Sequence, residues 1–291
     1  MNGSEQVSKT AVLTDSASDI PRELEEKYGI DILPFSIVVD GQSYTERVDF
    51  TNEQYYEMLT KAEGIPKTSQ ITMLRFLEKF CAYADEGYTD VIFVSINSAT
   101  YNAACMAAES LRDERPGCTM NVHVVDSHTY SMTYGWHVCE AARKLQAGAD
   151  VKSVVEYLED QLARMEIMLS MYTLRFVKKS GRVSAAAAFA GELLGLRPII
   201  HMVDDTTSTI AKVRGDSAVM PGLIVQTKKR MAEGTPYLIG ATDDGNAKML
   251  AKMCKKEFGY APAATFLLGA AVATNTGPNA VAIVYQGEKR R

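Results

Sequence analysis

The sequence predicts an α/β protein of two domains, the first with a mainly parallel sheet and the second with a mixed sheet. Its 291 residues suffice for about two domains of roughly 150 residues each. Short apolar runs alternate with amphipathic helical patterns through the first half, which indicates a parallel sheet covered by helices. A hairpin pattern interrupts that alternation in the second half. We expect an N-terminal domain over residues 8–165, a C-terminal domain over residues 166–291, and a boundary inside a helix.

Two sequence patterns predict the strands and helices of the first half: short apolar runs for strands, and apolar residues at helical spacing for helices. Residues 11–14, 90–96 and 121–126 are short and rich in Val and Ile, so they predict strands. Residues 73–87 and 151–165 predict helices, because apolar side chains recur at helical spacing. In the first of these helices that face consists of Met73, Leu74, Leu77, Phe80, Cys81 and Ala84.

The second half mixes patterns. Residues 185–195 are rich in Ala and Leu and predict a helix that ends at Gly195. Residues 197–215 predict a hairpin that turns at Asp204, Asp205 and Thr206. Residues 237–242 predict a strand followed by a helix over 246–259. Near the end, apolar runs flank the polar stretch "TNTGPN", which predicts a turn between two strands.

Composition excludes several classes of protein. The content of 46% hydrophobic and 23% charged residues is that of an ordinary globular protein. The net charge of -5 argues against a nucleic-acid binder. Five scattered cysteines without a Cys-x-x-Cys pair favour buried thiols in a reducing compartment. No apolar stretch approaches the roughly 18 residues that span a bilayer, and the polar N-terminus lacks a signal-peptide core. We therefore expect a cytoplasmic protein without stable membrane insertion, and a monomer.

Hydroxyl groups follow each predicted strand of the first half. The carboxyl ends of parallel strands form the usual ligand crevice of an α/β sheet, where helix N-termini favour an anion. Each cluster alone is also explained by helix capping, which prefers Ser, Thr and Asp. Three such clusters on one sheet edge together predict an anion site. Thr68 and Ser69, just before the helix predicted from Met73, form a fourth cluster of hydroxyl groups. The strand-end groups are Asp15, Ser16 and Ser18; Ser95, Ser98 and Thr100; and Asp126, Ser127, His128 and Thr129.

Catalytic and cofactor motifs are missing from the sequence. It contains no G-x-x-x-x-G-K-[ST] phosphate loop, no G-x-G-x-x-G after a strand and no G-x-S-x-G elbow. Its four histidines have no metal-ligand spacing. His123 and His201 lie in apolar runs and are expected to be structural, whereas His128 lies at a strand end. We expect a site that holds an anion, with no catalytic residue, no metal and no cofactor.

Together the clusters resemble the DegV family of bacterial fatty-acid-binding proteins. The resemblance spans residues 12 to 285. The matching stretches are "VLTDSASDIP", "KTSQ", "VSINSATYNAA", "VVDSHTYSMTYG", "LRFVKKSGRVSAAAAFAGELLGLRPIIHMVDDTTSTIAKVRG" and "NTGPNAVAIVY".

The resemblance implies two α/β domains with one long-chain fatty acid, such as palmitate, stearate or oleate, between them. It implies a buried tunnel for the acyl tail and a carboxylate held by hydroxyl groups of Thr68, with Ser69 adjacent, and Ser95. Ser98 and Asn275 complete the ligand-binding residues that we expect. Residues 185–195 and the Met-rich residues 165–176 are candidates for the tunnel lining, although ordinary core packing is the better explanation for any one of them.

Three departures from the family pattern bear on the ligand. Asn275 stands where the family commonly has His, Ile71 stands where it commonly has Pro, and "VSINSATY" replaces a loop with two serines and a glycine. An Asn side chain can donate a hydrogen bond to a carboxylate, but it does not titrate near neutral pH. We expect Asn275 to lie within hydrogen-bonding range of the ligand carboxylate, directly or through one water.

Two alternatives to simple binding stay open. Some family members present the fatty acid to a separate kinase that forms an acyl phosphate. A basic docking face for such a kinase could consist of Arg175, Lys178, Lys179, Arg182 and Arg214, which are equally well explained as a solvated surface. A remote alternative is a hydrolase with Ser95 as its nucleophile, although no partner base or acid is visible in the sequence.

Overall fold

The first half of the chain is built on a parallel sheet, as predicted. In this computed structural model, which describes residues 9–96, 98–176 and 195–290, the strand order is β2-β1-β6-β7. Every neighbouring pair in this sheet is parallel. The strands are β1 (Thr10–Asp15), β2 (Ile30–Leu33), β6 (Asp90–Ser95) and β7 (Asn121–Asp126).

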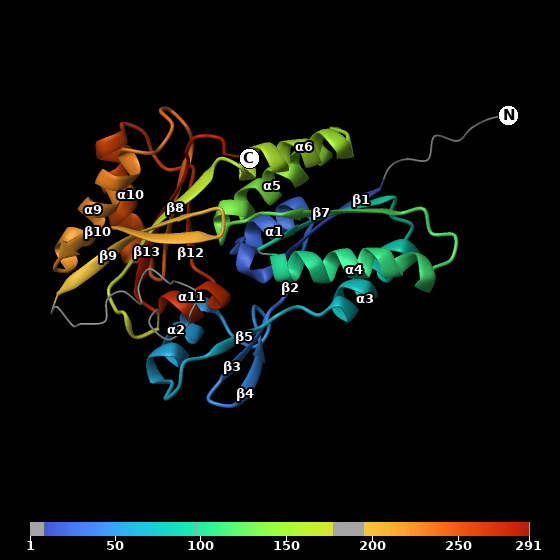
Figure 1. The fold of residues 1–291 in the computed structure, drawn as a ribbon, viewed down its shortest axis with the longest axis horizontal. Coiled ribbons are helices and arrows are strands. Elements are labelled where there is room, and N and C mark those ends of the chain that lie inside the picture. The colour runs from blue at the N-terminus through green and yellow to red at the C-terminus, as the bar shows by residue number, and fades with distance from the viewer. Residues whose placement is uncertain (1–8, 97, 177–194, 291) are drawn as a thin grey trace.

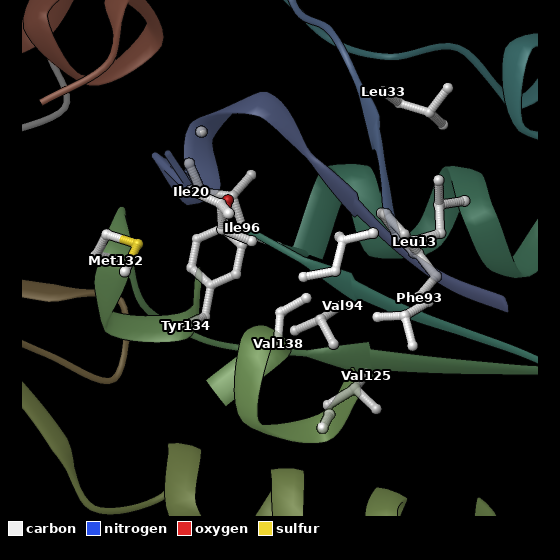
Figure 2. Packing of buried hydrophobic residues seen from close by; sticks show 14 of the residues in the cluster. Leu13, Ile20, Leu33, Phe93, Val94, Ile96, Val125, Met132, Tyr134 and Val138 are labelled. Atoms are coloured by element: carbon white, nitrogen blue, oxygen red, sulfur yellow. The ribbon is translucent and has the colours of Figure 1, made fainter. Parts of the chain in front are cut away.

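Helices cover both faces of this sheet (Figure 1). One face carries α3 and α4, and the other carries α1, α5 and α6. A short 3-10 helix, η1, follows β1 directly. The bounds are η1 (Ser16–Ser18), α1 (Arg22–Tyr28), α3 (Met73–Asp85), α4 (Ser98–Glu114), α5 (Met132–Gln146) and α6 (Val151–Leu162). Figure 2 shows Leu13, Phe93 and Val94 of the strands in one buried cluster with Tyr134 and Val138 of α5.

A mixed sheet organises the second half, in the order β10-β9-β8-β13-β11-β12. Its strands are antiparallel except for the pair β11 and β12. The hairpin of β9 and β10 turns at Asp204 and Asp205, as predicted. The bounds are β8 (Met165–Met171), β9 (Leu196–Val203), β10 (Thr206–Arg214), β11 (Tyr237–Ala241), β12 (Ala264–Leu267), β13 (Ala280–Gln286), η2 (Asp216–Ala218), α9 (Val219–Lys228) and α10 (Asp244–Phe258).

The central strands of the mixed sheet, β8, β11 and β13, are buried on both faces, and successive side chains along each strand point to opposite faces. Ile167 and Leu169 of β8 belong to the core of the first half, whereas Met168 between them packs with α9 and α10. In β13, Ala282 likewise belongs to the core of the first half, whereas Ile283 packs in the cluster with α9 and α10. The two halves therefore meet through a continuous apolar core rather than through a thin polar interface.

A small antiparallel sheet, β4-β3-β5, forms a third unit beside the helix α11 (Figure 1). It is inserted in the first half of the chain, yet its apolar cluster includes Ala270 and Ala273 of α11 from the second half. Tyr55 and Phe50 stack at 4.9 Å between ring centroids in this cluster. The bounds are β3 (Ser36–Val39), β4 (Gln42–Thr45), β5 (Lys67–Ser69), α2 (Asn52–Lys61) and α11 (Ala270–Thr276).

Two predictions of secondary structure are wrong. Met165 does not end a helix, because α6 stops at Leu162 and Met165 begins the buried strand β8. The stretch before "TNTGPN" is not wholly a strand: β12 ends at Leu267, and an alanine-rich run then forms α11. The predicted helix at 185–195 lies outside the described residues up to its final Gly195. The proposed division into domains at residue 165 stays a prediction.

The close approach of α5 to η1 depends on Gly135. A Cβ at this buried position would overlap the carbonyl oxygen of Ser18 and lie 3.0 Å from Ile20. Gly135→Ala should therefore destabilise the protein by about 1–3 kcal/mol, although Ala is normally the better helix residue. Urea denaturation measures the change.

Gly245→Ala is the matched control for this substitution. Gly245 is exposed on α10, and a Cβ there meets only the Asp243 carboxylate. Its unfolding free energy should change by less than about 1 kcal/mol. Equal effects of the two substitutions would contradict the packing argument.

Candidate ligand cavity

A cavity of about 150 Å³ lies where the first sheet, the mixed sheet and the small sheet meet. Its apolar lining comes from all three units and consists of Ala17, Phe35, Ile96, Ala99, Leu169, Met202, Ala271 and Val272. Its polar lining consists of Thr68, Gln70, Thr100, Tyr130, Asn275 and Thr276. None of these described lining residues carries a formal charge. An apolar cavity with a few convergent polar groups is the usual form of a small-molecule site.

Strand alternation decides between the adjacent hydroxyl groups of Thr68 and Ser69. Thr68 lies opposite Ile37 in the pairing of β5 with β3, and it lines the cavity. Successive side chains of a strand point to opposite faces. Ser69 accordingly lines a separate surface hollow, with Thr72 and Arg75. Of this pair, Thr68 is the one that a ligand in the cavity can reach.

Asn275 lies on the last turn of α11, in the cavity wall. Its Nδ2 donates to the carbonyl of Ala271 at 3.0 Å. A primary amide has two N–H donors, so one remains for a ligand. Gly277 then ends the helix with a φ of 87°, where a Cβ would overlap the ring of Phe176. The structure thus brings Thr68 and Asn275, from opposite halves of the chain, to one cavity.

Ser95 and Ser98 occupy different environments. Ser95 ends β6 with its side chain fully buried, and its carbonyl accepts from Ser127 N–H at 3.1 Å. The next residue, Ile96, lines the cavity, whereas Ser95 is not among its lining residues in the described chain. Ser98 is exposed at the start of α4 and lines another hollow with His128. The roles of Ser69, Ser95 and Ser98 in ligand binding stay predictions.

Thr100 and Tyr130 line the cavity, although the sequence does not predict a contact with the ligand for either residue. The sequence predicts Thr100 only as one of the hydroxyl groups at a strand end. It is buried on α4 at helical spacing from Ala103, Ala104 and Ala107, so periodicity could have placed it on the inner face. Tyr130 lies in the polar loop after β7. An aromatic residue in such a loop was the available signal, but its direction depends on the tertiary structure.

The two hydroxyl groups after β1 differ in their partners. Ser16 Oγ donates to Glu46 Oε2 at 2.5 Å, whereas the buried Ser18 Oγ has no hydrogen-bond partner among the described residues. Ser131, in the loop before α5, donates its hydroxyl group to Asp19. Asp15 accepts from Tyr134 O–H at 2.6 Å, from Ile96 N–H at 2.9 Å and from Ala17 N–H at 3.1 Å. This cluster therefore does not join the predicted anion site through its hydroxyl groups. It forms a buried polar network behind the cavity wall.

Histidines in the described chain pair with acidic or phenolic groups of the protein. His201 Nε2 lies 2.6 Å from Glu166, and His123 Nε2 lies 3.0 Å from Asp90, which agrees with their expected structural roles. His128 Nδ1 lies 2.6 Å from Asp205. His137 is buried beside the Tyr157 hydroxyl, and burial lowers its pKa to about 4. No group of metal-ligating side chains occurs among the described residues.

Burial raises the pKa of all the carboxyl groups in the network behind the cavity. It raises the pKa of Asp15 to about 7, although three donors favour the charged form. It also raises the pKa of Asp19 and of Glu46. The charge of Glu46 further raises the pKa of Asp15 and Asp19. The network therefore holds protons at a pH where exposed carboxyl groups have lost them.

The free energy of unfolding should fall as the pH rises, because the buried carboxyl group of Asp15 loses its proton. Its folded pKa of about 7 exceeds the ordinary 3.8, so its contribution is complete below about pH 4 and lost as the pH rises through about 7. About three pKa units correspond to roughly 4 kcal/mol. Asp15→Asn should lower the unfolding free energy near pH 5, because an acceptor is lost, and should flatten its decline towards pH 8. Urea denaturation across this range measures both effects.

Asp85→Asn provides the control for Asp15. Asp85 is exposed, and its hydrogen bond with Arg115 lowers the pKa of the carboxyl group. It is therefore ionised throughout the tested range in both folded and unfolded protein. A variant at Asp85 should keep the wild-type pH slope. Identical slopes for all three proteins would refute the assignment to Asp15.

Known proteins are similar to this chain in sequence and in fold. A family model described as "Uncharacterised protein, DegV family" matches residues 9–288. A DegV domain-containing protein of Clostridium perfringens is 29% identical over 283 residues, which cover 95% of this chain and 98% of that protein.

Solved structures of other proteins match the fold of this chain over nearly its whole length. A DegV lipid-binding protein from Thermotoga maritima is 25% identical with a TM-score of 0.82, and 97% of this chain and 100% of that chain are covered. A DegV family protein from Thermus thermophilus, described by its fatty acid binding, is 25% identical with a TM-score of 0.81, over 96% and 99% of the two chains. Because the family match, the relatives and the fold all span the full pattern of strands and helices, this chain belongs to the DegV family.

Proposed function

We propose that this protein binds one long-chain fatty acid, such as palmitate, stearate or oleate, as a carrier that performs no chemistry itself. The observation that carries the proposal is the cavity, which combines a mainly apolar lining with the convergent polar groups of Thr68 and Asn275. The lipid-binding and fatty-acid-binding descriptions of its relatives from Thermotoga maritima and Thermus thermophilus support it.

The lining chemistry suits a fatty acid. A saturated tail gains about 0.8 kcal/mol for each CH₂ that it buries, so a long chain needs no charged partner for affinity. The carboxylate can be satisfied by neutral donors such as the Thr68 hydroxyl and the free Asn275 N–H. Neutral donors also avoid the desolvation cost of a buried cation. In this proposal Ser95, buried one residue before Ile96, is a further candidate for the carboxylate.

The proposal also includes the cellular location and the oligomeric state of the protein. None of the described helices is long and apolar enough to cross a membrane. The five cysteines are free thiols, which supports a reducing compartment. We propose a cytoplasmic monomer on this basis. Size-exclusion chromatography with light scattering tests the monomer directly.

The protein purified from cells should carry about one fatty acid per chain, because long-chain lipid buried in such a cavity leaves slowly. Native mass spectrometry would give the mass of the bound species, and lipid extraction would identify it. The absence of any lipid, together with no binding of added palmitate or oleate, would refute the proposed function.

Removing the Thr68 hydroxyl should weaken fatty-acid binding. Thr68→Val keeps the shape of the side chain and deletes one hydrogen bond to a charged group, worth about 1.5–3 kcal/mol. The dissociation constant for palmitate should rise roughly ten- to hundredfold. Ser69→Ala, on the opposite face of β5, is the matched control and should leave the constant unchanged. The reverse order of effects would show that the carboxylate does not lie at Thr68.

Presentation of the fatty acid to a kinase is the second candidate. Of its proposed docking residues, Lys178, Lys179 and Arg182 lie outside the described residues, and Arg175 donates to the carbonyl of Ala62 at 2.7 Å. The hydrolase alternative would need substrate to reach Ser95, whose side chain is fully buried.

Asn275→His tests both the carboxylate site and the kinase. It restores the residue that is common in the family and should tighten fatty-acid binding or permit acyl phosphate formation with a DegV-partner kinase and ATP. Unchanged binding and no acyl phosphate would show that Asn275 only closes the cavity wall.

A further inference from the structure

Two segments that line the cavity, one from each half of the chain, contact each other beside it. Tyr130 lies in the loop between β7 and α5, and Met202 lies near the end of β9, and both line the cavity. His128 belongs to the same loop as Tyr130, and Asp205 belongs to the turn that follows β9. A contact between His128 and Asp205 therefore joins two walls of the cavity.

This contact uses both the backbone and the side chains. Asp205 N–H donates to the carbonyl of His128 at 3.1 Å, and His128 Nδ1 lies 2.6 Å from Asp205 Oδ2. An ionised carboxylate only accepts hydrogen bonds, so Nδ1 carries the proton and donates it to Asp205. The two side chains are 35% and 36% exposed, so the pair adds little to the stability of the whole protein. We call this pair of hydrogen bonds the clasp.

The residues of the clasp and of the turn have an unusual backbone conformation. The φ angles are 53° at His128, 44° at Asp204 and 58° at Asp205, in the left-handed region that residues other than glycine rarely adopt. A two-residue hairpin turn of this form usually contains Asn-Gly. Here both positions carry carboxylates with partners, since Asp204 accepts from Arg290 Nε at 2.9 Å and Asp205 accepts from His128. Strained residues persist where surrounding contacts hold them, as these contacts do.

The hairpin of β9 and β10 is held weakly by apolar packing at its turn. β10 is an edge strand of the mixed sheet, and none of its residues is buried. The last three residues of β9 are only partly buried, whereas every residue of the neighbouring strand β8 is buried. Segments with few buried apolar contacts open locally at a small cost in free energy. The polar contacts of the turn therefore matter for keeping this end of the hairpin beside the first half.

We propose that His128 and Asp205 are positioning residues for the ligand site, whose clasp holds the hairpin against the loop after β7 and so slows dissociation of the fatty acid. The inference rests on the proposed function, because the cavity beside the clasp is the one assigned to the fatty acid. When the clasp opens, Met202 is free to move away from Tyr130 while both apolar cores stay packed. The clasp therefore acts on the residence time of the ligand more than on the stability of the fold.

A first measurement uses amide hydrogen exchange of the ligand-free protein. Asp205→Gly and His128→Gly each remove the side-chain contact and place glycine where φ is positive, so neither variant adds backbone strain. After correction for intrinsic rates, peptides that cover residues 127–131 and 203–206 should exchange roughly two- to fivefold faster in both variants, as expected on loss of a partly exposed charged pair. The urea midpoint should stay close to that of wild type, which shows that the variants fold. Unchanged exchange in both segments would overturn the proposal.

A second measurement follows dissociation of radiolabelled palmitate. Each single variant should release palmitate roughly two- to fivefold faster than wild type. The double variant should be no faster than either single variant, because one contact can be lost only once. If the two glycines acted by general flexibility, their effects would multiply, and that result would refute the clasp. A wild type that binds no palmitate would refute the proposed function, and with it the control of ligand retention, while hydrogen exchange would still test the contact itself.

Two further variants separate the clasp from the flexibility of the turn. Asp204→Gly is the matched control, since it places glycine in the same turn but removes the bond to Arg290 and leaves the clasp intact. It should release palmitate at the wild-type rate. Asp205→Asn tolerates a positive φ and keeps an oxygen that accepts from His128, so it should restore slow release. Release from Asp204→Gly as fast as from Asp205→Gly, or no recovery in Asp205→Asn, would show that the proposal is wrong.

Discussion

The packing of one face of the mixed sheet against the first half is the constraint on which the rest of the structure depends. Alternate residues of β8 and β13 face the first half, and the residues between them face α9 and α10. A strand buried on both faces cannot slip by one residue without moving its whole apolar set. The relative placement of the halves is therefore as firmly specified as either core. The cavity can be small and still well defined because its walls belong to a common packed body.

The small sheet and α2 add a second connection between the halves. They are inserted before α3, yet their apolar cluster includes Ala270 and Ala273 of α11. Tyr55 and Glu46, one on α2 and one after β4, bond the same helix from two sides. Association of distant segments through both apolar and polar contacts explains how Thr68 and Asn275 meet although more than two hundred residues separate them in the sequence.

Periodicity in the sequence was enough to predict the fold class and most of the strands, because each of these features is encoded locally. The alternation of β1, β6 and β7 with amphipathic helices, and the hairpin of β9 and β10, were predicted in this way. Met165 and α11 were misassigned because apolar runs rich in Met or Ala satisfy a strand and a helix about equally. For the ligand cavity, the sequence motifs predicted which segments contribute to it, but not the direction in which each side chain points. Thr68 and Ser69 could be separated only once the pairing of β5 with β3 was known. The carboxyl group of Glu46 carried no sequence signal, since its burial arises from three separate segments.

The position of β5 at the margin of its sheet gives the chain a simple way to change what it binds. This short strand pairs with β3 on one side, and one residue of shift would place Lys67 or Ser69 where Thr68 now faces the cavity. A single insertion or deletion between α2 and β5 would suffice, in a segment that does not disturb the main cores. Lys67 would replace a neutral hydroxyl with a cation, and Ser69 would offer a smaller hydroxyl. Relatives that differ in loop length here are accordingly expected to differ in the head group of their ligand, even where the tail-binding walls are the same.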